Sequence, residues 1–259
     1  MEDVKKLKKE TYFSVTKSAT YGFLAALPLF VIYELLILLV NGDRVGEIRV
    51  GADVWIKQLL ALVGANGMWA LAVVVLVSGI VVFVKERKQR PPIKPAFLAW
   101  MIGESAIYAV FVAFLVSFSV GMLFSMSLST SLSSYVPALF QSASPNAPGT
   151  MTMLVLSIGA GLYEELIFRV VLVGGLFLIL NNFLGKRNLA YVIAAVIGAF
   201  VFSSVHYIGA LGDPFTMASF TFRFLFGLVL NVIFLLRGFG VAAWTHAIYD
   251  ILVVSHLLG

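Results

Sequence analysis

The sequence predicts an all-α fold: a polytopic bundle of transmembrane helices with about seven or eight spans and one short interfacial helix. Of the 259 residues, 61% are hydrophobic and only 12% are charged, whereas an ordinary soluble domain carries about 25% charged residues. Uncharged apolar stretches recur along the whole chain, and each is long enough to cross a hydrocarbon layer of roughly 30 Å. Basic residues gather in short clusters between these stretches.

Hydropathy places seven spans near residues 21–40, 66–84, 97–127, 151–180, 189–207, 218–236 and 241–258. The segment Val54–Val63 is too short to cross, so we expect it to lie in the interface as a helix. The apolar run Tyr21–Val40 is too long for a signal-peptide core and is expected to be retained as the first span. With no sequence repeat to divide the chain, we expect a single integral membrane domain over residues 1–259.

The basic clusters predict the orientation of the chain. They comprise Lys5, Lys6, Lys8, Lys9 and Lys17, then Lys85, Arg87, Lys88, Arg90 and Lys94, then Lys186 and Arg187, and finally Arg237. All fall on one side of the predicted spans, and basic residues are retained on the cytoplasmic side. We therefore expect a cytoplasmic N-terminus, with the loop 127–150 and the C-terminus outside, in a prokaryotic plasma (inner) membrane.

The net charge and the absence of cysteine exclude two classes of function. The net charge of +5 comes from these clusters and forms no continuous basic face, so nucleic acid is not an expected partner. The chain has no cysteine, which excludes disulfides and a thiolate nucleophile.

Several ionisable side chains lie inside the predicted spans. A charge at the bilayer centre costs at least about 2.5 to 3.5 kcal/mol on insertion scales, so such residues normally face the bundle interior and pair or act there. The set comprises Glu34, Glu104, Glu164, Glu165, Arg169, Arg223 and Asp250, with the imidazoles of His206 and His246. Helix packing needs fewer charges than this, so the set predicts a functional site.

The spacing of these residues separates supporting from reactive groups. Glu165 and Arg169 are four residues apart on one helix, so their side chains meet and the arginine can hold that carboxylate ionised. This leaves Glu164 available for chemistry. His246 and Asp250 are also four apart and share a helix face. Three helices therefore offer an acid, an imidazole, and an imidazole with an acid.

Such a set supports hydrolysis of an amide by an activated water molecule. A desolvated carboxylate is a competent general base, a neighbouring imidazole can share the water, and the remaining groups can donate to the oxyanion. Ser203, Ser204 and Thr245 adjoin the histidines but lack a G-x-S-x-G or Ser/Lys context, so we expect them to pack helices. Gly161, three residues before Glu164, predicts that another helix approaches closely there.

Three motifs occur in order, each in a predicted span: E-E-x-x-x-R at 164–169, F-x-x-x-H at 202–206 and H-x-x-x-D at 246–250. Together they resemble the signature of the CAAX protease and bacteriocin-processing family, over about residues 150–259. That family includes the Ras-converting CAAX endopeptidases and bacterial glutamic-type sorting proteases. The resemblance implies an intramembrane endopeptidase acting on a membrane-tethered or transmembrane protein, with membrane lipid as its surroundings.

The resemblance also implies residue roles. Glu164 and His206 would activate the water, and His246 with Asp250 would stabilise the oxyanion. Glu165 and Arg169 would be the supporting pair. Asp250 stands where CAAX enzymes usually carry Asn.

Glu34, Glu104 and Arg223 are further candidates for a supporting part in the site. With Tyr33, the two glutamates resemble bacterial branches that process C-terminal sorting signals of surface proteins. The alternative is that Glu34 and Glu104 only neutralise Arg223 or Arg169 inside the bundle.

Two histidines and a carboxylate can also bind zinc, and the ligands would then be Glu164, His206 and His246. There is no H-E-x-x-H motif, and the two imidazoles come from separate helices. The resemblance to CAAX endopeptidases favours a glutamate base and no cofactor, with zinc as the alternative.

Helix rise places Glu164 and His206 beyond the midplane, nearer the outer face, whereas His246 follows Arg237 closely and lies shallower from the inside. A turn at 237–240 recessed into the membrane would bring the three together. We therefore hypothesise that the substrate is a transmembrane or C-terminal segment of an exported protein and not a prenylated cytosolic tail.

Two other functions fit buried charges in a bundle. An ion- or proton-coupled transporter would use them as a relay, although the chain shows neither inverted repeats nor paired broken helices. A noncatalytic immunity or partner membrane protein would keep the bundle without needing the histidines. The sequence makes no prediction of the oligomeric state.

Overall fold

A computed structural model describes residues 11–42, 48–62, 64–65, 67–88, 91–125, 149–208 and 212–255. The regular elements in these ranges are helices: α1 (Tyr12–Thr16), α2 (Ala19–Asn41), α3 (Gly51–Leu62), α4 (Gly67–Lys85), α5 (Pro95–Phe124), α7 (Thr150–Glu165), the π-helix η2 (Leu166–Val173), α8 (Gly174–Leu184), α9 (Arg187–Val205), α10 (Met217–Arg237) and α11 (Phe239–Val254). The all-α prediction is confirmed. Predictions for Lys5, Lys6, Lys8, Lys9, Arg90, the loop up to residue 148 and the chain after Ser255 lie outside the described residues.

Among the described residues, five elements are long and apolar enough to cross a membrane: α2, α5, the continuous helix Thr150–Leu184, α9 and α10. The other two predicted spans correspond to α4 and α11, whose apolar stretches, Ala70–Lys85 within α4 and Phe239–Val254, are shorter. The 16 residues of α11 extend about 24 Å, less than the roughly 30 Å hydrocarbon layer. The last helix is therefore too short to cross on its own.

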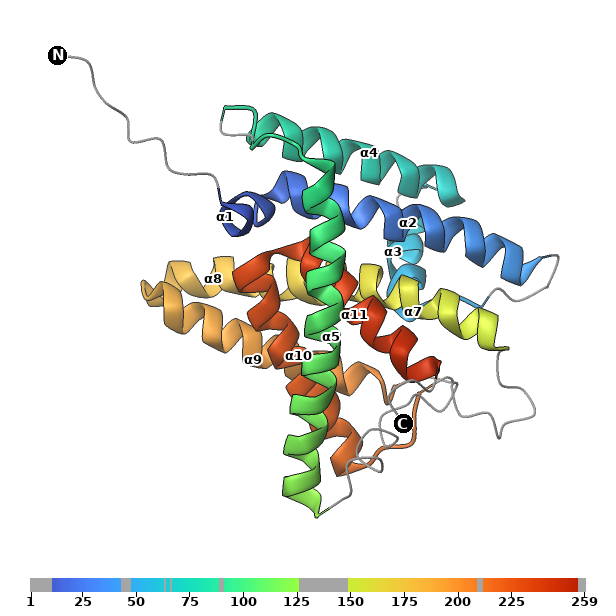
Figure 1. The fold of residues 1–259 in the computed structure, drawn as a ribbon, viewed down its shortest axis with the longest axis vertical. Helices are drawn as coiled ribbons and strands as arrows, with labels where there is room; N and C mark the ends of the chain where they lie inside the picture. Colours follow the sequence, from blue (N-terminus) through green and yellow to red (C-terminus); the bar gives the residue numbers. More distant parts are fainter. Residues whose placement is uncertain are drawn as a thin grey trace.

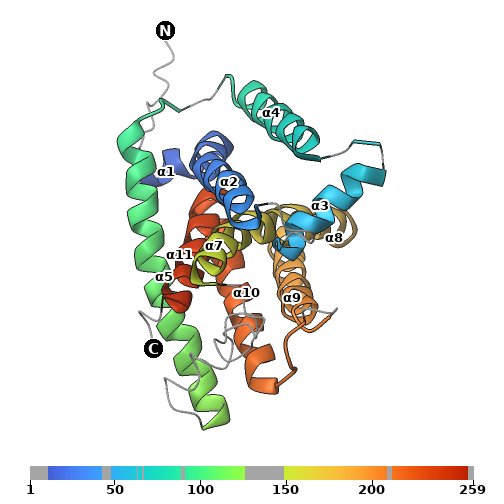
Figure 2. The same cartoon turned by 90° about the vertical axis from the view of Figure 1, so that its right-hand side faces the viewer.

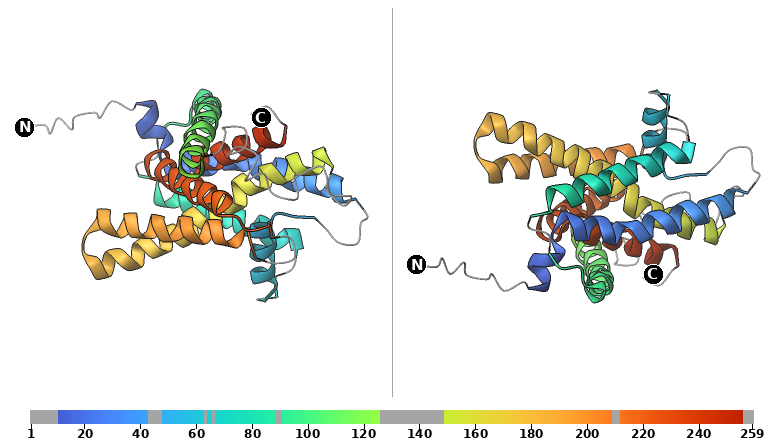
Figure 3. Two further views of the ribbon diagram at one scale, coloured as in Figure 1. Left: turned by 90° about the horizontal axis from the view of Figure 1, so that it is seen from below. Right: turned by 90° about the horizontal axis from the view of Figure 1, so that it is seen from above.

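The helices do not form a parallel bundle. In Figure 1, α2 and α4 lie side by side, the helix from α7 to α8 runs below them, and α5 crosses all of them steeply. The end-on appearance of α5 in Figure 3, where α8 and α9 run lengthwise, agrees with this crossing. α11 is central and contacts α2, α5, α7 and α10, with α5 and α3 on opposite sides of it (Figure 2).

Gly161 allows α7 and α11 to approach at backbone distance. A Cβ atom at this position would lie 2.5 Å from the Ala247 nitrogen and 2.6 Å from the Ala243 carbonyl oxygen. The predicted close helix approach is thus confirmed. Because Gly161 is one turn from Glu164 and Glu165, this contact also sets their distance from α11.

The α10–α11 turn packs inside the bundle. Gly238 has φ +85°, a left-handed conformation that glycine adopts without steric strain. A Cβ atom at Gly240 would lie 2.7 Å from the Ala25 Cβ and 3.1 Å from the Gly22 oxygen. The turn therefore sits against the first turns of α2, which supports the recessed position expected for it.

Glu104 pairs with Arg237 at the end of α10. The Arg237 Nε and Nη2 atoms donate to the two Glu104 oxygens at 2.5 and 2.8 Å, and the Tyr12 hydroxyl donates to Glu104 at 2.6 Å. The alternative that Glu104 neutralises Arg223 or Arg169 is wrong. Instead, this ion pair joins α1, α5 and α10.

Glu34 likewise has partners other than Arg223 and Arg169, and the alternative is wrong for it too. Its carboxylate lies 3.4 Å from Arg49 and 3.3 Å from Lys57. Lys57 lies in α3 (Gly51–Leu62), and Arg49 lies two residues before its start. α3 is the short helix that the sequence predicted at Val54–Val63. An arginine and a lysine thus bind α3 to the carboxylate that α2 buries.

The first turn of α3 is anchored in the bundle by two buried residues, Ala52 and Asp53, so the helix is not simply laid on the surface. Asp53 is fully buried, and its carboxylate lies 3.1 Å from Arg49 and 2.8 Å from Lys57. Leu59 and Leu62, in the second half, are exposed. One end of α3 is therefore fixed in the bundle, while the other presents apolar side chains outward.

We predict that Gly161→Ala lowers thermal stability in detergent, because the added methyl group meets α11 backbone atoms. Overpacking of this kind costs about 1 to 3 kcal/mol. Gly175→Ala in α8 is the matched control, since a Cβ atom there meets nothing within 4 Å, and its melting temperature should be unchanged or slightly higher. Equal melting temperatures for the two variants would contradict the close α7–α11 contact.

Candidate active site

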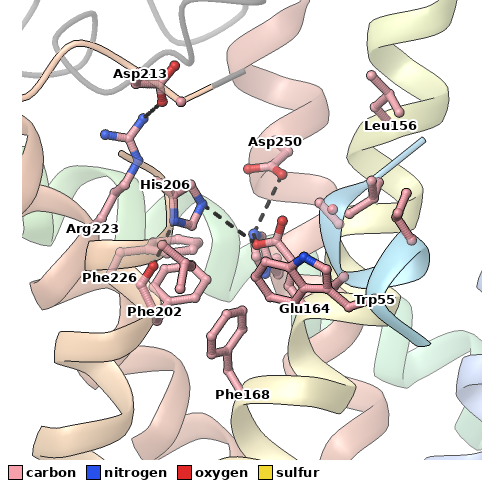
Figure 4. A pocket seen from close by; sticks show the side chains of 18 of the residues that line it. Trp55, Leu156, Glu164, Phe168, Phe202, His206, Asp213, Arg223, Phe226 and Asp250 are labelled. Atoms are coloured by element: carbon pink, nitrogen blue, oxygen red, sulfur yellow. Dashed lines mark hydrogen bonds and ion pairs between the residues drawn. The ribbon is translucent and has the colours of Figure 1, made fainter. Parts of the chain in front are cut away.

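A cavity of about 730 Å³ holds all four predicted catalytic side chains, Glu164, His206, His246 and Asp250. Its walls come from α3, α7, η2, α9, α10 and α11 and from residues next to α3 and α9. Figure 4 shows Glu164 facing His206 across the cavity, with Asp250 above them. Residues from helices far apart in the sequence therefore share one pocket.

Glu164 lies between two imidazole rings. Its Oε2 atom is 3.9 Å from the His206 Nε2 atom and 4.0 Å from the His246 Nε2 atom. These separations exceed a direct hydrogen bond, but one water molecule can reach a carboxylate and an imidazole at this spacing. The Glu164 side chain is 17% exposed, so water can enter.

The protonation of His206 follows from its position at the end of α9. The Nδ1 atom lies 2.7 Å from the Phe202 carbonyl oxygen, and a carbonyl can only accept a hydrogen bond. Nδ1 therefore carries a proton and donates. In the neutral ring Nε2 is then the acceptor nitrogen, and this is the atom that faces Glu164.

His246 is held between carboxylates from two helices. Its Nδ1 atom lies 2.7 Å from Glu165 Oε1, and its Nε2 atom lies 3.5 Å from Asp250 Oδ2. The side chain is only 4% exposed. Glu165 and Asp250 thus orient the ring so that Nε2 points into the pocket toward Glu164.

The predicted contact between Glu165 and Arg169 is present. Arg169 Nη1 lies 2.9 Å from Glu165 Oε1, and both side chains are almost completely buried. The Arg169 guanidinium also stacks 4.5 Å from the centre of the Phe202 ring, an arrangement that favours a cation over an aromatic face. The pair therefore connects α7 with α9 and, through Glu165, with His246 of α11.

Sequence reasoning missed the π-helix η2, which begins directly after Glu165 and contains Arg169. Segments of π-helix inside α-helices are rare and often occur at functional sites. No simple sequence signal marks it. It also places Phe168 in the pocket wall, where its ring packs edge-on against Phe202 at 5.2 Å.

Arg223 lines the pocket but belongs to a separate ion pair. Its Nη2 atom lies 2.5 Å from Asp213, and its Nη1 atom donates to the Tyr207 hydroxyl at 2.7 Å and to Ser219. The Asp213 backbone nitrogen donates to the His206 carbonyl oxygen at 2.8 Å. Arg223 therefore holds Tyr207 and Asp213 beside His206. Sequence reasoning missed Asp213, although an acidic residue so close to a motif histidine was a usable signal.

Metal binding has no support from side-chain spacing in the part of the chain that the structure describes. Within those residues, no group of three or more His, Asp or Glu side chains is arranged to hold a metal ion. The preference for a metal-free site and the zinc alternative at Glu164, His206 and His246 both stay predictions.

Comparison with known proteins identifies the C-terminal part of the chain. Residues 146–252 match the family model described as Rce1-like, type II CAAX prenyl endopeptidase. No curated protein and no solved structure matches the chain. The match includes all three motifs and confirms the predicted resemblance, and together with the five apolar helices it identifies an integral membrane protein.

We predict that Arg169→Met strongly destabilises the fold, because it leaves Glu165 buried without its cation. Removing one partner of a buried ion pair costs about 3 to 5 kcal/mol. The double variant Glu165→Gln/Arg169→Met should recover part of the thermal stability, measured as the melting temperature in detergent. Arg187→Met, at an exposed position, is the control and should have little effect. A single variant as stable as this control would contradict the supporting role of the pair.

Proposed function

We propose that this chain, whose residues 146–252 match the Rce1-like CAAX endopeptidase family model, hydrolyses a peptide bond in a membrane-associated protein by direct attack of water. The observation that carries the proposal is the position of the Glu164 carboxylate, about equally distant from the Nε2 atoms of His206 and His246. One carboxylate with an imidazole on each side provides a base for the water and a donor for the oxyanion.

In the first step, water lies between Glu164 Oε2 and His206 Nε2. Glu164 accepts one proton of the water, while the unprotonated Nε2 of His206 accepts a hydrogen bond from the other. The water oxygen bonds to the substrate carbonyl carbon, and the carbonyl π electrons move to its oxygen. Because His206 Nδ1 is held by the Phe202 carbonyl, the ring keeps this orientation throughout the attack.

His246 stabilises the resulting oxyanion. Its Nδ1–H donates to Glu165, so only the doubly protonated ring can also donate from Nε2. The nearby carboxylates of Glu165 and Asp250 stabilise that imidazolium. Asp250 thus acts through the charge of His246 and needs no amide N–H of its own, which accounts for an aspartate at a position where CAAX enzymes usually carry asparagine.

In the second step, the tetrahedral intermediate collapses. Glu164 returns the proton that it took from water to the leaving amine nitrogen, the C–N bond breaks, and the oxyanion electrons restore the carbonyl. The products are a carboxylic acid and an amine, and Glu164 is again a carboxylate. No covalent enzyme intermediate is needed.

The hydroxyl groups of the two serines near His206 are occupied with the helix backbone. Ser203 donates to the Phe220 carbonyl and Ser204 to the Phe200 carbonyl, both at 2.8 Å. This supports their expected role in helix packing and disfavours a serine nucleophile.

We predict that Glu164→Gln abolishes proteolysis, because removal of a general base typically costs 10²- to 10⁴-fold in rate. The measurement compares new protein termini in membranes of cells that express each variant in place of the wild type. His206→Ala should lose the same products, while Ser204→Ala should retain them. Products that persist with Glu164→Gln would contradict the mechanism. If this variant changed ion-coupled uptake and not proteolysis, the transporter would be favoured.

We also predict that the purified enzyme cleaves a peptide covering one of these termini after exhaustive treatment with a chelator. The expected activity equals that of the untreated enzyme, because a carboxylate base needs no Lewis acid. Activity that disappears on chelation and returns only with added zinc would establish the zinc alternative.

A further inference from the structure

The residues that line the pocket lie toward one end of each of the three motif helices, α7, α9 and α11. On α7 its wall consists of Leu156, Ala160 and Glu164, which lie one turn apart on a single face. On α9 only the C-terminal end takes part, ending at His206, and on α11 the wall continues past Asp250 to the last residues of the helix. The cavity therefore occupies the N-terminal half of the α7–α8 helix and the C-terminal ends of α9 and α11.

The described basic clusters lie at the opposite helix ends. They comprise Lys17 before α2, Lys85, Arg87 and Lys88 at the end of α4, Lys94 before α5, Lys186 and Arg187 between α8 and α9, and Arg237 at the end of α10. α9 alone, with its 19 residues, separates Arg187 from His206 by about 28 Å, close to the thickness of the hydrocarbon layer. The pocket and the basic clusters therefore lie toward opposite faces of the membrane.

Contacts between helices hold several of these basic ends together. The Glu86 carboxylate accepts hydrogen bonds from the backbone nitrogens of Ala19 and Thr20 at 2.8 and 2.9 Å. The backbone nitrogen of Lys94 donates to the Tyr21 hydroxyl at 2.8 Å. The start of α2, the end of α4 and the start of α5 thus meet at one face, on the upper left in Figure 1.

Cations on the pocket side are paired with carboxylates. Arg49 contacts Glu34 and Asp53, and Arg223 contacts Asp213. Lys and Arg residues near span ends determine orientation, and cations paired with carboxylates contribute much less net charge. On the basic face Arg237 is paired in the same way, with Glu104, so the contrast rests on the lysines and on Arg87 and Arg187. The charge difference between the two faces therefore favours the basic face as the cytoplasmic one.

We infer that the pocket opens to the non-cytoplasmic side of the membrane, so that the substrate is an apolar transmembrane or C-terminal segment of an exported protein. A prenylated tail made in the cytosol would meet the opposite face. The sidedness follows from the helix ends and the charges alone, whereas the substrate class rests on the proposed proteolytic function.

The shape of the pocket adds a statement about the cleaved segment. From Glu164 to Leu156 its α7 wall extends about 12 Å, the length of three or four extended residues. The facing walls include apolar side chains such as Trp55 on α3 and Val253 on α11, together with the polar Gln58. The scissile bond therefore lies three or four residues inside the mouth, in a passage that apolar side chains line in part.

The first test measures sidedness without relying on proteolysis. Because the chain has no cysteine, Gln58→Cys in the pocket wall and Lys88→Cys after α4 each introduce a single thiol at an exposed position. A membrane-impermeant maleimide should label Gln58→Cys in right-side-out vesicles and fail to label it in inside-out vesicles, with the reverse result for Lys88→Cys. Labelling of Gln58→Cys from the cytoplasmic side would overturn the inference.

The second test compares two reporters that carry the same apolar segment. One is exported and ends in a membrane-anchored C-terminal segment, and the other is cytosolic and ends in a prenylated CAAX tail. Only the exported reporter should be cut, and its cleavage should be lost with Glu164→Gln. Cleavage of the prenylated reporter alone would overturn the inferred substrate while leaving the proteolytic function intact. If neither reporter is cut although labelling is as expected, the sidedness stands and the proposed function fails.

Discussion

The buried ion pair between Glu165 and Arg169 is the interaction on which the site depends. A charge inside a membrane protein needs a partner, and here each partner also touches a further helix. Glu165 accepts from His246 on α11, and Arg169 stacks on Phe202 of α9. Together with the backbone contact at Gly161, the pair fixes the three motif helices relative to one another and leaves Glu164 free to face the pocket.

The other buried charges follow the same rule and join elements that are distant in sequence. Arg237 and Glu104 join α10 to α5 and α1, and the Glu34 cluster joins α2 to α3. In lipid, apolar surface contributes little to helix association, so polar contacts and close packing of small residues carry more of it. The charges that hydropathy would reject thus fix α3 beside the pocket and hold the end of α10 against α1 and α5 at the other end of the helices.

Sequence could predict the helices, the motif residues and every contact that depends on local spacing, such as Glu165 with Arg169. It could also place a close helix approach at Gly161, because only glycine permits one. It could not identify ion-pair partners on different helices. Arg223 and Arg169 were the candidate partners of Glu34 and Glu104, yet the cations that pair with them are Arg49, Lys57 and Arg237. Such pairs depend on tertiary distances. The π-helix has no signal in the local periodicity, whereas Asp213 could have been noted from its closeness to His206 in sequence, although its pairing with Arg223 could not.

The central claim is that Glu164 and His206 activate a water molecule while His246 binds the oxyanion. The most direct measurement is an experimental structure with a phosphinate peptide, whose two oxygens imitate the attacking water and the oxyanion. The account predicts one oxygen within hydrogen-bond distance of Glu164 and His206, and the other within hydrogen-bond distance of His246 Nε2. A phosphinate bound elsewhere in the pocket, with Glu164 turned away from it, would contradict the account.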